Sequence, residues 1–344
     1  MLKIRYKITY IMKYLTLILV AFLITTSCNQ DKSKYIKNQG QAHGTFYHVV
    51  YESPNGVDYH DQLRSTMQRI DKSLSTYDPV SVISRINQND SSVVLDDHFL
   101  NVYRKAEEIA NETHGAFDIT VAPLVNAWGF GYTEPQRTDS VSIATILEYV
   151  GYEKVHLING NLNKDTAAIQ LDASAIAKGY SVDQAAEKLE KKGIKNYMVE
   201  IGGEIRVKGQ NPNGLAWRIG IDEPTEDQAL MDRKIQRILH INKGALATSG
   251  NYRQFYEKNG QKYAHTINPK TGYPVQHRLL SASVLAPDCM TADAYATAFM
   301  VLGYHASMDI VEQDPELEAY FILSGEDEPF EVKYSDGMQS HLKD

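Results

Sequence analysis

Apolar residues recur at helical spacing in several stretches of the chain. Leu63, Met67, Ile70 and Leu74 lie on one side of the first predicted helix, and Pro79 follows it. A proline cannot continue a helix, so this helix is expected to end before it. Further helices are predicted at about residues 97–113, 140–150 and 291–302.

Alternating β-branched and aromatic residues predict strands between these helices. The first is expected at residues 44–51, GTFYHVVY. Other predicted strands cover 155–158, 168–171, 197–201, 205–207, 217–221 and 235–241. The segments at 155–158 and 168–171 are expected to pair, and a charged insertion is expected at about 224–233. Because strands outnumber helices and come as hairpins, we expect an α+β fold with mixed or antiparallel sheets and packed helices, in one large domain over residues 41–335.

The chain between residues 171 and 209 combines a polar turn, a short helix and a tight hairpin. Asp172 and Ser174 are natural N-cap residues, and the helix after them carries an apolar stripe at 182–189. Gly202 and Gly203 permit a tight reversal between two strands. One interpretation is that free N–H groups at the helix entrance bind an anionic ligand. The other is a plain connection from a helix to a hairpin, which these residues alone favour.

The first 27 residues have the pattern of an export signal. Lys3, Arg5, Lys7 and Lys13 precede a short apolar run at 15–24, and small residues lead to Cys28. About 20 apolar residues are needed to span a bilayer, so this run is too short for a mature transmembrane helix. We expect a lipoprotein-type signal peptide over residues 1–27, lipidation of Cys28 and a polar tether over residues 28–40. An ordinary cleaved signal is the alternative.

Lipidation of Cys28 would leave Cys289 without an intrachain partner. The core, rather than disulfides, would then stabilise the exported chain. We expect a lipoprotein that is anchored to the inner or outer bacterial membrane and faces the periplasm. A short tail over residues 336–344 is expected after the domain.

The charge of the mature chain argues against nucleic acid as a partner. Loss of residues 1–27 removes four positive and no negative charges, which changes the formal net charge from −8 to −12. No basic stripe offsets this balance, so no nucleic-acid binding is expected. A dinucleotide would also be repelled unless a divalent cation bridged its phosphates to the protein.

Three motifs carry candidate chemistry. Asp293 and Thr297 are one helical turn apart, so a carboxylate and a hydroxyl, both hard ligands of the kind that Mg²⁺ prefers, lie on one face. His265 precedes a loop that contains proline and glycine. Trp128 and Phe130 stand among glycines and suit a surface that stacks on a flat ring. Each motif has a plain alternative: a carboxylate that satisfies the helix dipole, a structural histidine and a packed loop.

Eight segments, in this order, resemble the ApbE family of FAD:protein FMN transferases. They are GTFYHVV, LSTYDPVSVISRIN, GAFDITVAPLVNAWGFG, LDASAIAKGYSVD, VEIGGEIRVKG, ALATSG, HTINPKTGYP and TADAYATAFMVLG. The resemblance implies an enzyme that binds FAD with Mg²⁺ and transfers the FMN half to a threonine hydroxyl of an exported acceptor protein, releasing AMP. Positioning and electrostatic stabilisation do most of the work in such phosphoryl transfer.

The resemblance also implies roles for individual residues. Mg²⁺ ligands are expected from the side chains of Asp293 and Thr297 and from the backbone carbonyl of Ala175, and His265 is the expected catalytic base. The positions that match the lining of the FAD site are His43, Tyr77, Ala116, Phe117, Asp118, Asp172, Lys178 and Ile267. One departure stands out, because the family usually has aspartate where this chain has Asn268. If that carboxylate orients the histidine or assists the metal, the amide does so only as a neutral group.

Two other functions are compatible with these motifs. One is Mg²⁺-dependent hydrolysis of FAD to FMN and AMP, in which water attacks the same phosphorus atom. The other is a flavin-binding lipoprotein without catalytic activity. The pair Asp293 and Thr297 argues against a pure binder, since binding an isoalloxazine ring needs no metal site.

Overall fold

The computed structural model describes residues 34–131, 138–224, 234–251, 255–258, 261–325 and 327–342. The predicted signal peptide, Cys28 and most of the predicted insertion at 224–233 lie outside these residues. Among the described residues, no helix is both long enough and apolar enough to cross a membrane.

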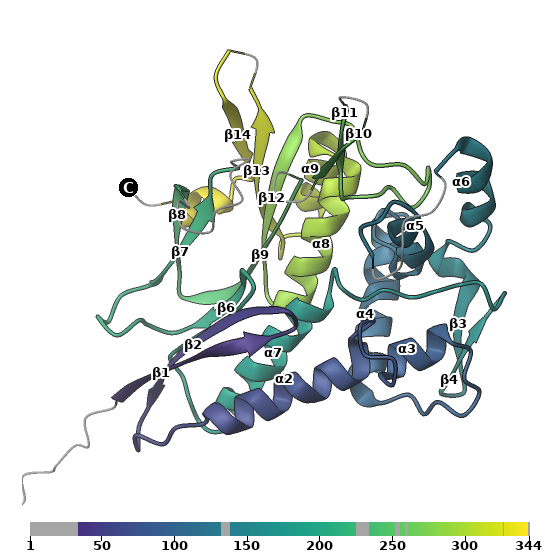
Figure 1. Ribbon diagram of the computed structural model, residues 1–344. Helices are drawn as coiled ribbons and strands as arrows, with labels where there is room; N and C mark the ends of the chain where they lie inside the picture. The colour runs from purple at the N-terminus through teal and green to yellow at the C-terminus, as the bar shows by residue number, and fades with distance from the viewer. Residues whose placement is uncertain are drawn as a thin grey trace, which may run out of the picture.

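An eight-stranded antiparallel sheet forms the centre of the structure (Figure 1). Its spatial order is β1 (Lys34–Ala42), β2 (Thr45–Ser53), β5 (Tyr197–Ile201), β6 (Glu204–Lys208), β9 (Lys243–Gly250), β12 (Leu279–Ala286), β13 (Glu318–Ser324) and β14 (Phe330–Tyr334). Gly202 and Gly203 have φ values of 67° and 108°, so the predicted tight hairpin between β5 and β6 is confirmed. This hairpin places Glu204 at the start of a central strand.

The described part of the chain also forms three two-stranded sheets beside the large one. They are β3 (Val155–Ile158) with β4 (Asn161–Lys164), β7 (Trp217–Asp222) with β8 (Ile235–Ile241), and β10 (Phe255–Lys258) with β11 (Gln261–Ala264). The predicted pairing of 155–158 with 168–171 is wrong, because the chain reverses earlier. Asn159 and Gly160 both have positive φ, at 50° and 79°, which closes a two-residue turn directly onto β4.

The described helices are concentrated on one face of the large sheet and beside it (Figure 1). They are α2 (His60–Leu74), α3 (Val82–Asn87), α4 (Asp97–Glu112), α5 (Ala122–Ala127), α6 (Ser140–Leu147), α7 (Ala177–Glu190), α8 (Cys289–Leu302) and α9 (Tyr304–Gln313), with the 3₁₀ turns η1 (Ile119–Val121), η2 (Tyr152–Lys154) and η3 (Met338–His341). Helices α7 and α8 pack on the sheet, and their apolar residues form the main cores with it. On the other face, β7, β8 and η3 bury a smaller core.

The predicted tether and tail both need correction. Residues 34–40 belong to β1, which pairs with β2 along its whole length, so a tether ends before Lys34. At the other end Met338 is fully buried, and Leu342 bridges to Leu239 of β8. Residues 336–342 are therefore packed on the domain. Their backbone is held by Glu318, whose Oε2 accepts a hydrogen bond of 2.9 Å from the N–H of Met338.

The predicted caps of the helix after residue 171 are also wrong. Helix α7 begins at Ala177, and its N-cap, Ile176, makes no side-chain capping bond. Instead the Oδ1 of Asp172 accepts a hydrogen bond of 2.8 Å from the N–H of Ser174 in a turn before the helix. Asp172 therefore shapes the loop that leads to Ala175, rather than the helix itself.

Candidate active site

Helices α7 and α8 cross at Gly179 and Cys289. A Cβ atom on Gly179 would lie 2.2 Å from the carbonyl oxygen of Cys289 and 2.8 Å from the Cβ of Asp293. Only glycine allows this approach, which brings the backbone of one helix to a carboxylate of the other. The N–H of Gly179 donates a hydrogen bond of 2.9 Å to the Oδ2 of Asp293.

Asp293 and Thr297 stand one turn apart on α8, as predicted. Asp293 is 3% exposed, and the Thr297 hydroxyl lies 3.1 Å from the Oγ of Ser249 on β9. Ala175 lies in the turn at 174–176 that leads into α7. Among the described residues, no three histidine, cysteine, aspartate or glutamate side chains gather as a metal site. The predicted ligands are one carboxylate, one hydroxyl and one backbone carbonyl, a set that fits Mg²⁺ with the rest of its shell supplied by substrate and water.

Lys178 lies between two buried carboxylates. Its Nζ is 2.5 Å from the Oε1 of Glu204 and 3.8 Å from the Oδ1 of Asp293. Burial lowers the pKa of Lys178, but the charges of Asp293 and Glu204 have a larger combined effect and hold that pKa above its usual range. Burial raises the pKa of Glu204, an effect that Lys178 opposes and Asp293 reinforces. Lys178 was predicted to line the FAD site, and the structure places it next to the predicted metal ligands.

A third buried carboxylate, Asp183, fixes the start of α8. Its Oδ1 accepts hydrogen bonds from the N–H of Cys289 (2.9 Å) and from Arg206 (2.7 Å), and its Oδ2 accepts one from the N–H of Met290 (2.8 Å). Burial is the main cause that raises the pKa of Asp183 to about 6. A side chain of α7 thus satisfies free N–H groups at the N-terminus of α8. The sequence carried no signal for this contact, since the partners are more than a hundred residues apart.

The predicted flavin-site segment at 116–118 is largely buried. Ala116 and Phe117 are 5% and 2% exposed. The Oδ1 of Asp118 accepts hydrogen bonds from the N–H and hydroxyl of Thr120, and its Oδ2 accepts one of 2.8 Å from the N–H of Tyr152. Burial raises the pKa of Asp118 to about 6. The carboxylate therefore organises its own loop.

Asp172 lies beside this loop. Its N–H donates a hydrogen bond of 2.7 Å to the carbonyl of Ile119, directly after Asp118. Asn87 of α3 holds the preceding residue, Leu171, through a pair of hydrogen bonds of 2.7 and 2.8 Å. Burial raises the pKa of the Asp172 carboxyl. The structure thus brings together two segments that the sequence predicted separately.

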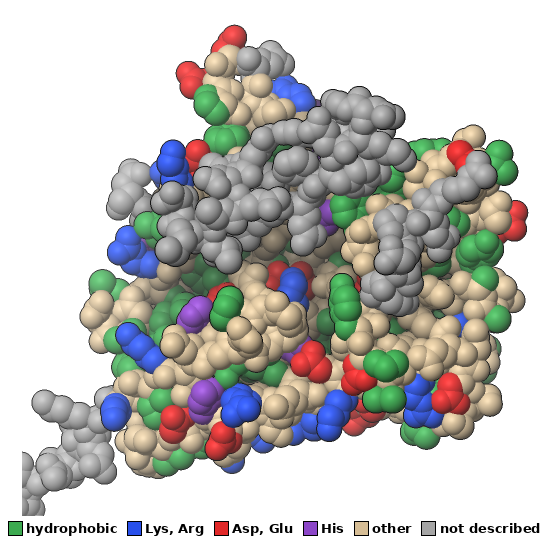
Figure 2. Space-filling view, viewed as in Figure 1, with side chains coloured by type: hydrophobic (Ala, Val, Ile, Leu, Met, Phe, Trp, Pro, Cys, Tyr) green, Lys and Arg blue, Asp and Glu red, His purple; other side chains and the backbone are tan. Residues whose placement is uncertain are grey.

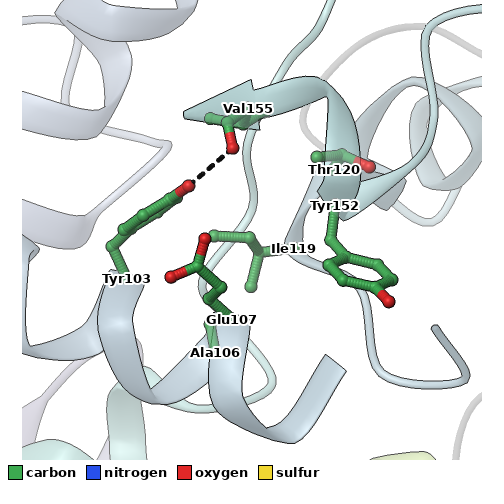
Figure 3. A pocket seen from close by; sticks show the side chains of 7 residues that line it. All are labelled: Tyr103, Ala106, Glu107, Ile119, Thr120, Tyr152 and Val155. Carbon is green, nitrogen blue, oxygen red and sulfur yellow. Dashed lines mark hydrogen bonds between the residues drawn. The ribbon is translucent and has the colours of Figure 1, made fainter. Parts of the chain in front are cut away.

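A small pocket lies behind the Asp118 loop (Figure 3). The Tyr103 hydroxyl donates a hydrogen bond of 2.8 Å to the Val155 carbonyl at its edge. The residues that line it are Tyr103, Ala106, Glu107, Ile119, Thr120, Tyr152 and Val155. Its volume of about 10 Å³ is close to the least that holds one water molecule, so it is no site for a flavin.

His265 lies next to Phe130, with ring centroids 6.3 Å apart in an edge-to-face arrangement. It stands at the start of a loop that Ile267 closes by bridging to Pro274. Trp128 is 7% exposed and donates a hydrogen bond of 2.8 Å to the carbonyl of Gly272 in this loop. The packed-loop interpretation therefore holds for Trp128, which fixes the histidine loop rather than offering a face for stacking.

Asn268 has a local structural role. Its Oδ1 accepts hydrogen bonds from the N–H groups of Lys270 (2.9 Å) and Thr271 (3.2 Å), and its backbone pairs with Gly272 and Tyr273. A carboxylate oxygen can accept the same two bonds. The loop therefore requires an acceptor oxygen at this position but no negative charge. This requirement explains how asparagine can replace the usual aspartate.

His43 and Tyr77 occupy very different positions. The Nδ1 of His43 is 2.7 Å from Asp71 on α2, and its Nε2 is 2.7 Å from Ser181 on α7. With both nitrogens engaged, His43 ties the β1–β2 turn to two helices. Tyr77 follows α2 and is 76% exposed. A role in flavin binding stays a prediction for both residues.

The face drawn in Figure 2 is hollowed in the region where α7 and α8 lie in Figure 1. Acidic, basic and apolar side chains meet inside this hollow. Such a mixture suits a ligand that has both an apolar ring system and charged groups.

Comparisons with known proteins identify the family of the chain. A model described as the ApbE family matches residues 43–321. A relative from Haemophilus influenzae named FAD:protein FMN transferase is 38% identical over 322 residues, covering 89% of this chain and 92% of its own. A relative of the same name from Escherichia coli K12 is 31% identical and covers 88% of both chains.

Solved structures extend the likeness to three dimensions. The flavin transferase ApbE from Vibrio cholerae has a TM-score of 0.79 and 35% identity, over 90% of this chain and 100% of that one. The apo form of the flavinyl transferase ApbE from Pseudomonas stutzeri also has a TM-score of 0.79, with 29% identity, and covers 90% of this chain and 97% of its own. The expected α+β fold is confirmed, and the chain belongs to the ApbE family.

Proposed function

We propose that this chain is an Mg²⁺-dependent FAD:protein FMN transferase that modifies a threonine of an exported acceptor protein. The observation that carries the proposal is the position of Asp293 and Thr297. They stand together on α8, and the N–H of Gly179 fixes one carboxylate oxygen of Asp293, while the other has only a long ion pair with Lys178 among the described residues. The relatives named FAD:protein FMN transferase support the reaction itself.

Each part of the site has a task in this reaction. Mg²⁺ held by Asp293, Thr297 and the Ala175 carbonyl would neutralise the charge of the FAD pyrophosphate. The loops shaped by Asp118 and Asp172 are joined by the hydrogen bond from the Asp172 N–H to the Ile119 carbonyl, and the second loop leads to Ala175, so both would contact the nucleotide next to the metal. His265 takes the proton of the acceptor threonine hydroxyl.

The bond changes balance without a further reactant. The threonine oxygen forms a bond to the phosphorus atom on the FMN side of the pyrophosphate. The bond from that phosphorus to the bridging oxygen breaks, and AMP leaves with the electron pair. The proton from the threonine passes to His265 and then to solvent or to the leaving phosphate.

We also propose that lipidation of Cys28 keeps the enzyme at the membrane surface. Because β1 begins at Lys34, only residues 29–33 separate the anchor from the folded domain. Five extended residues span at most about 18 Å. The acceptor would therefore be another protein at or near the same membrane surface. Loss of membrane association on replacement of Cys28 by serine, measured by detergent partition, tests the anchor, and continued association would overturn it.

The transfer is tested with purified protein, FAD, Mg²⁺ and an acceptor domain that contains the target threonine. Intact-mass spectrometry is expected to show an acceptor heavier by one FMN unit, with one AMP released for each acceptor modified. An acceptor with alanine in place of that threonine is the matched control and is expected to stay unmodified. Release of FMN and AMP beside an unmodified acceptor would overturn transfer and favour hydrolysis.

A further inference from the structure

The ammonium group of Lys178 lies closer to one of two buried carboxylates than to the other. It lies 2.5 Å from the Oε1 of Glu204 and 3.8 Å from the Oδ1 of Asp293. We propose that Glu204 is a positioning residue: it holds Lys178 away from Asp293, so that the Oδ1 of Asp293 stays open to a divalent cation. The inference rests on the proposed metal site and adds a residue that controls access to it.

The two oxygens of Asp293 are not equivalent. Oδ2 accepts the N–H of Gly179 at 2.9 Å, so Oδ1 is the atom with room for a metal. A lysine ammonium is a compact charge on a flexible stem and competes directly with a cation for a carboxylate oxygen. If Lys178 moved to hydrogen-bond distance, it would occupy the direction that the metal needs.

Glu204 is placed to prevent this movement. Its side chain is only 6% exposed, and Lys178 is its one hydrogen-bonded side-chain partner among the described residues. The other oxygen, Oε2, is buried without a hydrogen-bond partner in the described structure. A Cβ added to Gly202, which has a φ of 67°, would lie 3.3 Å from Oε2, so the turn passes close to the carboxylate on that side.

Burying a carboxylate with one unsatisfied oxygen costs free energy, which the ion pair between its other oxygen and Lys178 offsets. The Lys178 ammonium lies within ion-pair distance of both carboxylates, at 2.5 Å from Glu204 and 3.8 Å from Asp293. Glu204 is the nearer partner and supplies the carboxylate that holds the lysine beside the predicted metal ligand.

Metal binding, rather than turnover, tests this role. The probe is Mn²⁺ titrated into the purified mature domain without FAD or acceptor, with free Mn²⁺ measured by electron paramagnetic resonance. Glu204→Gln keeps the shape of the side chain but weakens its hold on Lys178. We expect it to weaken Mn²⁺ binding by about 10- to 100-fold, the usual effect of changing a residue that supports a metal ligand.

The double variant separates an action through Lys178 from a direct one on the metal. Lys178→Met removes the competing charge, so Mn²⁺ affinity in this variant is expected to equal or exceed that of the wild type. In Glu204→Gln with Lys178→Met, affinity is expected to return to within about threefold of Lys178→Met alone, because the two changes are coupled. Thermal unfolding of each variant checks that it is folded.

The outcomes distinguish this inference from the proposed function. Wild-type affinity in Glu204→Gln would overturn the inference and leave the metal site intact. A double variant as weak as Glu204→Gln would also overturn it, because Glu204 would then act on the metal directly. Should Glu204→Gln fail to fold, weaker Mn²⁺ binding by Lys178→Met would decide against the inference. Failure of the wild type to bind Mn²⁺ would remove the metal site and this inference together.

Discussion

Gly179 and Cys289 touch backbone to backbone where α7 crosses α8. The space for a Cβ on Gly179 is taken by the Cys289 carbonyl oxygen, 2.2 Å away. The same crossing brings the N–H of Gly179 to Asp293, so one glycine sets both the packing of the two helices and the orientation of the predicted metal ligand.

Replacement of Gly179 by alanine is expected to push the helices apart. Overpacking of this kind costs about 1–3 kcal/mol, and the hydrogen bond to Asp293 would lengthen. We expect a lower midpoint of urea unfolding and a greater loss of FMN transfer than the loss of stability explains. Gly220→Ala is the matched control, because its Cβ would lie at an ordinary 3.4 Å from Ile235. Equal stability of Gly179→Ala and the wild type would contradict the crossing.

Asp293→Asn and Thr297→Val are expected to weaken the binding of Mg²⁺. Asparagine can still accept the Gly179 N–H but has no charge, and valine keeps the shape of threonine without its oxygen. Each change should raise the Mg²⁺ concentration for half-maximal AMP release by at least about tenfold. Thr297→Ser keeps the hydroxyl and is expected to stay near the wild type. A serine variant as impaired as the valine variant would argue that Thr297 acts through packing.

Asn268→Asp is expected to preserve transfer, while Asn268→Ala is expected to impair it. Aspartate keeps an oxygen for the N–H groups of Lys270 and Thr271, whereas alanine leaves both without that acceptor. Loss of each such bond costs about 1 kcal/mol and loosens the loop that carries His265. Rates of FMN transfer at saturating FAD measure the effect. A large gain of activity in Asn268→Asp would show instead that the site benefits from the charge.

The buried carboxyl of Asp118 is expected to make stability fall as pH rises from about 4 to about 6. Its pKa in the folded chain is about 6, above the usual 3.8, so in this range the native state keeps a proton that the unfolded chain has lost. The free energy of unfolding therefore decreases with pH, by at most about 3 kcal/mol for a shift of this size.

Asp118→Asn removes this titration. The slope of the free energy of unfolding against pH should then be flatter between pH 4 and 6, whatever the absolute stability of the variant. Asp61→Asn is the control, since that side chain is 98% exposed. Urea denaturation across the range measures the slopes, and identical slopes for Asp118→Asn and the wild type would refute the assignment.

The periodicity of the sequence predicted most of the described helices and the β5–β6 hairpin, because those patterns depend on local contacts. Asp293 and Thr297 share one helical turn, so their spacing sufficed to predict a common face. The tight hairpin at Gly202 and Gly203 could be predicted from the sequence because few residues other than glycine adopt positive φ. The strand β1 was missed because its segment is polar and becomes a strand only by pairing with β2.

Tertiary structure alone decided which groups meet. Lys178 could be read as a flavin contact from its place in a motif, but only the fold puts it between Glu204 and Asp293. Asp183 reaches the start of α8 from another helix, and Asn268 faces its own loop rather than the histidine. The sequence, through its resemblance to a known family, thus predicted the reaction class and the candidate residues. The electrostatic partners of those residues depend on the crossing of α7 and α8, because helices far apart in the chain meet only when the core is packed.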